Sequence, residues 1–274
     1  MRLKDLLKDE FDEHELAHLV QGYDLVGDIA ITIIPTELSH RQQLIGEAIL
    51  ATNKRIKVVA KRDGFYQGEF RTAPLTIIAG EDRKETQHVE FGVRLMLNPE
   101  LVYFSVRSST ERKRVADLVV PGEDILVMFS GAAPYPLMIN KYSKARSIVG
   151  VESNPHAHSY GTRNLTLNKV KDSVELFLGD AAEAVPRLYR KYHRIIMPLP
   201  TASHEYLPMA LRYLLPDGTI HFYDFQPVGN FDDSLRTVAE LCRRAKRVIL
   251  SSTPVVCGHT SPGINRVCVD AMIG

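Results

Sequence analysis

The stretch that decides the fold is DILVMFSGAAP, residues 124–134. Its apolar run Ile125–Phe129 predicts a buried strand, and Ser130-Gly131 predicts a tight turn into a following helix. A glycine at such a turn lets the backbone approach a bound nucleoside or amino acid, and the amides of the helix can receive a carboxylate. Alone, this pattern fits a plain strand–helix turn as well as it fits a cofactor loop.

Short apolar runs and helical patterns alternate from this stretch to the end of the chain. After Ile125–Phe129 the predicted strands are Ser147–Val151, Val174–Leu178, Arg194–Met197, Thr219–Tyr223, Val248–Ser251 and Asn265–Asp270. The predicted helices are Pro136–Ser143, His156–Leu167, Ala181–Tyr192, His204–Leu214 and Asp232–Ala245. This alternation predicts an α/β fold with a mostly parallel sheet.

The last two predicted strands have only a loop between them, which indicates a terminal antiparallel hairpin. Class I methyltransferases, with their Rossmann-like seven-stranded sheet, end in this way. A nucleotide-binding dehydrogenase more often adds a further parallel strand. The ending therefore favours the methyltransferase fold.

The N-terminal part has a different character and predicts a smaller α+β domain. Its expected strands are Tyr23–Ile34 (interrupted at Gly27-Asp28), Ile56–Ala60, Leu75–Ala79 and Glu100–Val106, with helices at Arg41–Thr52 and Ser108–Leu118. Residues 1–22 form a polar helical segment that packs loosely or is the remnant of a larger module. We therefore expect a helical segment at 1–22, an α+β RNA-docking domain at 23–116 and a cofactor domain at 117–274.

The composition limits the class of protein and the kinds of site that can be expected. The 274 residues are 45% hydrophobic and 24% charged, with a net charge of +1, which is ordinary for a globular protein. Neither a cleavable signal peptide nor a membrane span is visible, so we expect a cytoplasmic protein without membrane contact. Three cysteines without paired spacing predict neither a metal site nor a disulfide. Basic residues cluster at Lys54–Arg62, Arg107–Arg114 and Arg187–Arg194, and each cluster alone is more often a solvated face than a phosphate-binding surface.

Carboxylates follow two neighbouring predicted strands. Glu152-Ser153 ends one of them, where an acidic side chain can accept hydrogen bonds from both ribose hydroxyls of a nucleoside. Asp180-Ala181 follows the next strand, where a carboxylate can receive an adenine amino group. A lone acidic residue at such a place is usually a helix cap, but two of them beside the Gly131 loop favour a nucleoside cofactor.

Further segments resemble the archaeal and eukaryotic tRNA (guanine-N1)-methyltransferase family. The resemblance covers the chain from about Asp24 to its end, and it is carried by residues 68–71, 79–86, 102–107, 109–115, 152–157, 164–170, 204–205, 220–224 and 261–267. It implies S-adenosyl-L-methionine as cofactor, the anticodon stem-loop of tRNA as partner and guanosine 37 as target. We also expect a monomer. Wyosine-pathway aminocarboxypropyl transferases are close cousins of this family.

The resemblance also implies roles for individual residues. Guanine N1 carries a proton at neutral pH, so its methylation needs a base and stabilisation of the charge on O6. Glu111 is implied as the base, Arg71 as the O6 partner and Arg107 as an orienting group. The implied cofactor-binding residues are Arg112, Ser130, Gly131, Glu152, Ser153, Asp180, Ala181, Pro198 and Pro200.

The chain departs from the family pattern at four places. The family has Asp, Gly, Asn and Pro where this chain has Val127, Ala133, Pro198 and Val106. Three functions therefore stay open: guanine-N1 methylation; a wyosine-pathway reaction, either aminocarboxypropyl transfer or methylation of a wyosine intermediate; and tRNA binding without catalysis.

Overall fold

The computed structural model describes residues 3–261 and 263–274, which divide into two compact units. The first unit runs to Glu90 and includes Arg94–Val106, and the second comprises Phe91–Val93 and Arg107–Gly274. The helix predicted at Ser108–Leu118 is α4 (Ser109–Asp117), and it is grouped with the second unit.

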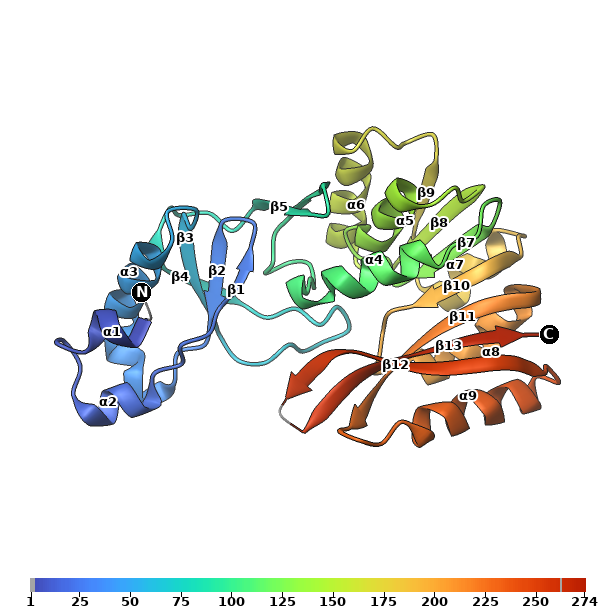
Figure 1. The fold of residues 1–274 in the computed structure, drawn as a ribbon. Helices are drawn as coiled ribbons and strands as arrows, with labels where there is room; N and C mark the ends of the chain where they lie inside the picture. The colour runs from blue at the N-terminus through green and yellow to red at the C-terminus, as the bar shows by residue number, and fades with distance from the viewer. Residues whose placement is uncertain (1–2, 262) are drawn as a thin grey trace. The chain divides into compact units, whose positions relative to one another are not determined.

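The second unit is built on a seven-stranded sheet (Figure 1). Its strands lie in the order β12-β13-β11-β10-β7-β8-β9, and only β13 runs antiparallel to its neighbours. Their bounds are β7 Asp124–Met128, β8 Ser147–Glu152, β9 Val174–Leu178, β10 Tyr192–Met197, β11 Leu214–Pro227, β12 Ile249–Ser261 and β13 Ile264–Ile273. The predicted α/β fold with a terminal antiparallel hairpin is confirmed.

Helices cover both faces of this sheet (Figure 1). They are α4, α5 Pro134–Tyr142, α6 Pro155–Leu167, α7 Ala181–Arg187, α8 Ser203–Tyr213 and α9 Asp232–Arg244. Alternate strand residues such as Leu126, Ile195 and Phe222 join one apolar core with residues of α7, α8 and α9. Because successive strand residues point to opposite faces, the residues between them, such as His221 and Tyr223, point to the other face.

The helix predicted at Ala181–Tyr192 is too long at its C-terminal end. Helix α7 stops at Arg187, one residue after Pro186, and Tyr189 has a left-handed φ of 51°. Proline inside a helix removes a backbone donor and crowds the preceding turn, which explains the early stop. Tyr192 instead begins β10 and is fully buried.

The first unit has a four-stranded sheet in the order β1-β2-β3-β4 and a separate β5–β6 hairpin. The strands are β1 Asp24–Val26, β2 Ile29–Thr32, β3 Val58–Arg62, β4 Leu75–Gly80, β5 Thr86–Glu90 and β6 Val93–Leu97. The helices are α1 Leu3–Leu7, α2 Glu13–His18 and α3 Gln42–Thr52, with a 3-10 turn at Thr36–Arg41. Leu3, Leu7 and Phe11 are buried in one core with α3, so the described part of the expected segment 1–22 is packed into this unit.

The expected strand at Glu100–Val106 is wrong. This segment starts with a turn in which the amides of Leu101 and Val102 donate to the carbonyl of Asn98, and it ends in a 3-10 turn at Val106–Ser108. The strands of this region are β5 and β6, joined at Phe91-Gly92, where both residues have positive φ. No helix among the described residues is both long enough and apolar enough to cross a membrane.

Candidate functional site

The loop after β7 has an unusual backbone. Phe129, Gly131 and Ala133 have φ values of 55°, 57° and 66°. A Cβ added to Gly131 would meet no heavy atom within 4 Å, so its backbone borders open space. Ala133 is fully buried and adopts, at the N-cap of α5, a conformation that suits glycine better. The departure at Ala133 therefore leaves the backbone path intact.

Neighbouring elements hold this loop in place. The Ser130 amide donates to the carbonyl of Val151 at 2.9 Å, and the buried Asn164 side chain of α6 donates to the carbonyl of Ala132 at 3.0 Å. Ser130 is itself buried. The loop is thus fixed to β8 and to α6.

Glu152 joins this loop to the end of β8. Its two carboxylate oxygens accept hydrogen bonds from the Gly131 amide at 2.7 Å and the Asn154 amide at 2.8 Å. Burial raises the pKa of Glu152 above its ordinary value, although these backbone hydrogen bonds oppose the rise. Ser153 lies between Glu152 and Asn154 in the sequence and is half-buried. The predicted strand-end carboxylate is therefore present, but part of its bonding capacity is used within the protein.

Asp180 is a helix cap, as a lone acid after a strand usually is. Its side chain accepts from the Ala182 amide at 2.7 Å and from the Tyr206 hydroxyl at 2.8 Å, and Ala181 begins α7 as a buried residue. Strands β7, β8 and β9 are parallel neighbours, so the loops that carry Gly131, Glu152 and Asp180 leave one edge of the sheet.

Pro198 and Pro200 follow β10, the other parallel neighbour of β7. The Leu199 amide donates to the carbonyl of Met197 at 2.8 Å, which closes a three-residue turn around Pro198. The fixed φ of proline suits such a turn. The Ser203 hydroxyl donates to the Met197 and Leu199 carbonyls, both at 2.9 Å. Backbone and Ser203 contacts therefore hold the turn, and Pro198 offers a ligand no side-chain amide.

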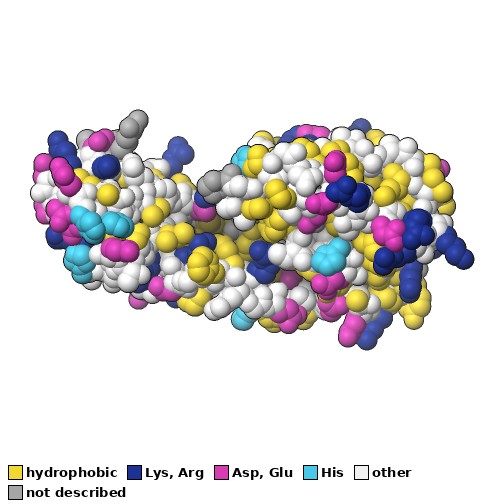
Figure 2. Space-filling view, turned by 90° about the horizontal axis from the view of Figure 1, so that it is seen from below, with side chains coloured by type: hydrophobic (Ala, Val, Ile, Leu, Met, Phe, Trp, Pro, Cys, Tyr) yellow, Lys and Arg dark blue, Asp and Glu magenta, His cyan; other side chains and the backbone are white. Residues whose placement is uncertain are grey.

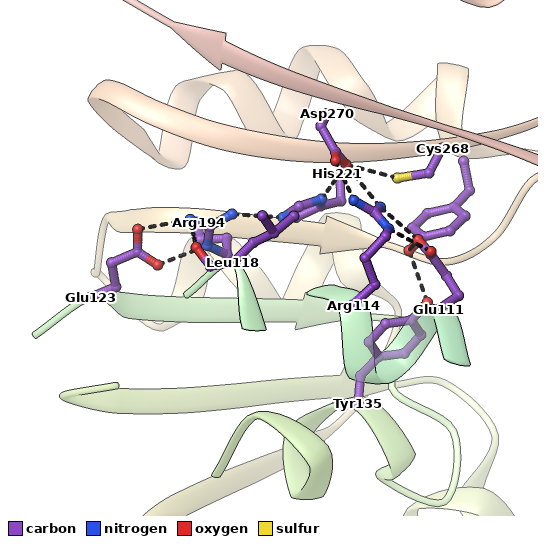
Figure 3. A network of polar contacts seen from close by, with 10 residues as sticks. Glu111, Arg114, Leu118, Glu123, Tyr135, Arg194, His221, Cys268 and Asp270 are labelled. Atoms are coloured by element: carbon purple, nitrogen blue, oxygen red, sulfur yellow. Dashed lines mark hydrogen bonds and ion pairs between the residues drawn. The ribbon is translucent and has the colours of Figure 1, made fainter. Parts of the chain in front are cut away.

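Glu111 lies in α4 with its side chain buried and paired (Figure 3). Oε2 accepts from Nε of Arg114 at 2.7 Å, and Oε1 accepts from Nη2 of Arg114 at 2.8 Å. Oε1 also accepts from the hydroxyl of Tyr223 at 2.6 Å, so the Tyr135 hydroxyl, 2.9 Å from that of Tyr223, is the donor to it. The carboxylate is thereby fixed by α4, α5 and β11.

Arg114 continues this chain of contacts to β13 and β10 (Figure 3). Its Nη1 donates to Asp270 at 2.5 Å, and Asp270 also lies 2.6 Å from Nδ1 of His221. Arg194 donates from Nη1 to Nε2 of His221 at 2.8 Å and pairs with Glu123 at 2.7 Å. Because a guanidinium can only donate, the proton of neutral His221 is on Nδ1 and is donated to Asp270.

Burial and pairing compete in this network, which we call the Glu111–Glu123 network. Burial lowers the pKa of His221, although Asp270 acts in the opposite sense. Burial would raise the pKa of Asp270, but hydrogen bonds from His221 and Arg114 outweigh it and hold that pKa well below its ordinary value. Asp270 and Arg114 are therefore ionised at neutral pH, and His221 is neutral.

His221, Asp270 and the Cys268 thiol, which donates to Asp270 at 3.2 Å, form a group with metal-ligand chemistry. Their possible ligand atoms lie within 4.8 Å of one another. Both nitrogens of His221 are engaged, and the guanidinium of Arg114 contacts the Asp270 carboxylate. A metal cation there would be repelled by the nearby guanidinium groups of Arg114 and Arg194, so the donor set does not fit a metal ion.

The three arginines expected at the site occupy different environments. Arg112 is buried in α4, and Arg107 is exposed in the 3-10 turn that precedes α4. Arg71 belongs to the first unit, where it has a φ of 51° at the end of a short hairpin loop. Its guanidinium lies 5.6 Å from the ring centroid of Tyr103. Arg107 and Arg112 are thus four residues or fewer from Glu111 in sequence, whereas Arg71 is on the other unit.

Aromatic and arginine side chains gather around Arg71 in the first unit. The rings of Tyr66 and Tyr103 contact edge to face at 5.3 Å, and Arg62 lies 4.7 Å from the ring centroid of Tyr66. Phe65 is 85% exposed beside them. We call Arg62, Phe65, Tyr66, Arg71 and Tyr103 the aromatic–arginine cluster.

Ion pairs interrupt two of the three basic clusters of the sequence, Arg107–Arg114 and Arg187–Arg194. Arg194 is buried in the Glu111–Glu123 network, Arg190 pairs with Glu175, and Lys113 pairs with Asp117. Figure 2 shows charges of both signs interspersed over one face of the molecule. Spacing along the chain is therefore a poor guide to basic surface here.

Sequence reasoning missed most of the Glu111–Glu123 network. Arg114, Asp270 and Arg194 appeared only within basic clusters or strand bounds, and their partners lie up to 156 residues away. One pattern points to them: His221 and Tyr223, two residues apart on β11, are paired in register with Asp270 and Cys268 on β13. Polar residues at alternate positions of two apolar strands indicate a polar layer on one face of the sheet.

Family models match both parts of the chain. The TRM5/TYW2 methyltransferase domain matches residues 86–250, and the TYW2 N-terminal domain matches residues 3–83.

Three known proteins are similar to this chain over most of its length. The tRNA (guanine(37)-N(1))-methyltransferase Trm5b of Pyrococcus abyssi is 38% identical over 245 residues, 86% of this chain and 72% of that protein. Its crystal structure covers 96% of this chain and 78% of its own, with a TM-score of 0.87 and 34% identity. The tRNA 4-demethylwyosine(37)-methyltransferase Taw21 of Saccharolobus solfataricus is 29% identical over 92% of this chain and 95% of its own. The complex of aTrm5 with tRNALeu has a TM-score of 0.87 at 27% identity and covers 100% of this chain and 78% of its own. The chain belongs to the TRM5/TYW2 methyltransferase family.

Proposed function

We propose that this protein transfers a methyl group from S-adenosylmethionine to N1 of guanosine 37 in tRNA, with Glu111 as the proton acceptor. The observation that supports this most is the buried Glu111 carboxylate. It is oriented by Arg114 and Tyr223, and it lies in the unit that carries the strand-end loops. The 38% identity to a tRNA (guanine(37)-N(1))-methyltransferase supports the same target.

The residues at the edge formed by β7, β8 and β9 fit S-adenosylmethionine. Gly131 borders open space, and Glu152 and Asp180 supply carboxylates at two successive strand ends. We propose that Ser130, Gly131, Glu152, Ser153, Asp180, Ala181, Pro198 and Pro200 line the cofactor site, with Arg112 near it. When bound, the cofactor supplies an electrophilic methyl group on a sulfonium.

Glu111 has room for one proton. A carboxylate offers about four lone-pair positions. Oε1 accepts two hydrogen bonds, whereas Oε2, among the described residues, accepts only that from Arg114 Nε. We propose that Oε2 receives the N1 proton while Arg71 stabilises O6 and Arg107 orients the nucleotide. Holding these groups in position accounts for most of the rate in such a transfer.

We propose that the aromatic–arginine cluster contacts the anticodon loop of tRNA. Unpaired bases stack on aromatic rings and on guanidinium planes, and the cluster offers both, with Phe65 largely exposed. The relative whose structure contains tRNALeu supports tRNA as the partner. We also propose that the protein is cytoplasmic, that it acts as a monomer and that it needs no metal ion.

The test is transfer of labelled methyl groups to unmodified tRNA, with analysis of the product nucleosides by mass spectrometry. We expect 1-methylguanosine at position 37 from the wild type and a loss of about 100-fold or more with Glu111→Gln, in the range for removal of a general base. Undiminished activity of Glu111→Gln would refute the assigned role.

Methylation of 4-demethylwyosine is the second candidate, because the match to Taw21 spans nearly the whole of both chains. The two candidate activities are separated by parallel methylation assays, one with tRNA transcripts that carry guanosine 37 and one with tRNA that carries 4-demethylwyosine. Mass spectrometry also detects an aminocarboxypropyl product by its larger mass. Micromolar binding of S-adenosylhomocysteine would exclude the third possibility, a tRNA-binding protein that has lost its cofactor site.

A further inference from the structure

Arg114 pairs with two carboxylates on different elements. Its Nε and Nη2 hold Glu111 of α4 at 2.7 and 2.8 Å, and its Nη1 holds Asp270 of β13 at 2.5 Å. Arg114 is therefore still paired with one carboxylate when Glu111 takes up a proton. Asp270 is itself held by His221 at 2.6 Å, and Arg194 holds His221 from the other side.

Several other groups face Glu111. Tyr223 of β11 donates to it, and Tyr135 of α5, Cys268 of β13 and Cys257 of β12 interact with it electrostatically. Burial raises the pKa of Tyr223 above its ordinary value and that of Cys257 to about 11, so both are neutral at physiological pH. Among the described residues, the charged groups that pair with Glu111 or with its partner Arg114 are Arg114 and Asp270, and the buried Arg112 also acts electrostatically on Tyr135.

We infer that Arg114 and Asp270 are positioning residues for methyl transfer, which fix the orientation of the Glu111 carboxylate and set the pH at which it gains a proton. The inference rests on the proposed function, in which Glu111 accepts the N1 proton. Arg114 favours the carboxylate by its charge and holds both of its oxygens in a bidentate pair. Asp270 offsets part of that charge and keeps the guanidinium in place throughout the reaction.

The test compares pH profiles of single-turnover methyl transfer for four variants. Arg114→Gln removes the cation beside Glu111, so the acidic limb of the profile moves to higher pH by about one unit or more. Asp270→Asn removes an anion and leaves Arg114, so its acidic limb moves the opposite way. Arg114→Lys keeps the charge but not the bidentate geometry, so its limb stays near that of the wild type while its plateau rate falls about tenfold. Glu111→Gln lacks the limb altogether.

A second readout does not depend on activity. A protonated carboxyl group gives a characteristic infrared band. The band that is present in the wild type and missing in Glu111→Gln belongs to Glu111, so it reports the protonation of that residue directly. We expect this band to appear at higher pH in Arg114→Gln and at lower pH in Asp270→Asn. General destabilisation does not produce shifts of opposite sign. Asp270→Asn also keeps the test decisive where Arg114→Gln fails to fold.

The outcomes separate this inference from the proposed function. The inference alone would be overturned if Glu111→Gln is inactive but the acidic limb of the pH profile and the infrared band keep their wild-type pH in both Arg114→Gln and Asp270→Asn. Full activity of Glu111→Gln would overturn the base role itself, and the inference with it. Arg236→Gln is the matched control, because Arg236 also pairs with an acidic residue, Asp233, but on the exposed surface of α9. Its profile should equal that of the wild type, and a shift there would overturn the assignment to Arg114.

Discussion

Gly122 and Gly131 form a matched pair of positions at the two ends of β7. Gly122 precedes the strand with a φ of +87°, and Gly131 follows it with a φ of +57°. An added Cβ would meet no heavy atom within 4 Å at either position. A residue with a Cβ destabilises the folded state by about 1–2 kcal/mol when its backbone is left-handed. Replacing glycine also lowers the conformational entropy of the unfolded chain, which stabilises the folded state by about 0.4–1 kcal/mol. We therefore expect each glycine-to-alanine change to lower the free energy of unfolding by about 1 kcal/mol.

The two variants should differ in cofactor affinity. The methyl group of Gly131→Ala projects into the open space of the proposed cofactor loop, so we expect the Kd for S-adenosylhomocysteine to rise at least tenfold, or about 1.4 kcal/mol. Gly122→Ala should bind with unchanged affinity, because it lies at the opposite end of the strand. Calorimetric titration measures the affinity, and urea denaturation measures the stability. Equal affinities for the two variants would refute the placement of the cofactor against this loop.

Two further changes test other parts of the molecule. Phe65→Ala should weaken tRNA binding by about 1 kcal/mol or more, as loss of one base-stacking ring does. The exposed Tyr189→Ala serves as control, and equal effects in filter binding would contradict the role of the aromatic–arginine cluster. The pKa of Asp270 is depressed because hydrogen bonds from His221 and Arg114 outweigh burial, so its ionisation adds stability that is complete above the unfolded value near 4 and is lost as the pH falls. The difference in unfolding free energy between wild type and Asp270→Asn should hold from pH 6 to 8 and shrink below about pH 4; a constant difference down to pH 3 would contradict this.

Strand positions were predictable where a strand is buried on both faces. The runs that became β7 and β8 are short and apolar, and they are bounded by turn residues, so their limits came within one residue. The limits of β9 were also correct, although this strand is partly exposed. The β5–β6 hairpin escaped prediction because its turn is Phe91-Gly92 rather than a typical Asn-Gly or Asp-Gly pair. The run at Glu100–Val106 looks like a strand in composition, but the amides of Leu101 and Val102 donate to the carbonyl of Asn98 in a local turn.

Local sequence predicted candidates for the site but not their partners. Glu152 and Asp180 were chosen from strand ends and Glu111 from the family resemblance, and the structure places each beside hydrogen-bond donors. The pairing of Arg114 with Asp270 spans 156 residues and depends on the antiparallel placement of β13 against β11. Sheet register is a tertiary property, and a one-residue slip would turn Asp270 to the opposite face.

Two departures from the family pattern, Ala133 and Pro198, lie in ordered turns, although their side-chain chemistry differs from that of the family. Ala133 keeps the left-handed turn, and the turn at Pro198 is closed by backbone bonds, so an intact fold does not by itself argue for activity. The Glu111–Glu123 network does argue for it. Burying ionised groups costs desolvation that apolar packing of similar volume avoids, and paired burial is weak evidence for stability. An array that fixes Glu111 while leaving one position on Oε2 for a proton has a use in catalysis and none in RNA binding alone, which favours the working enzyme over the catalytically inactive alternative.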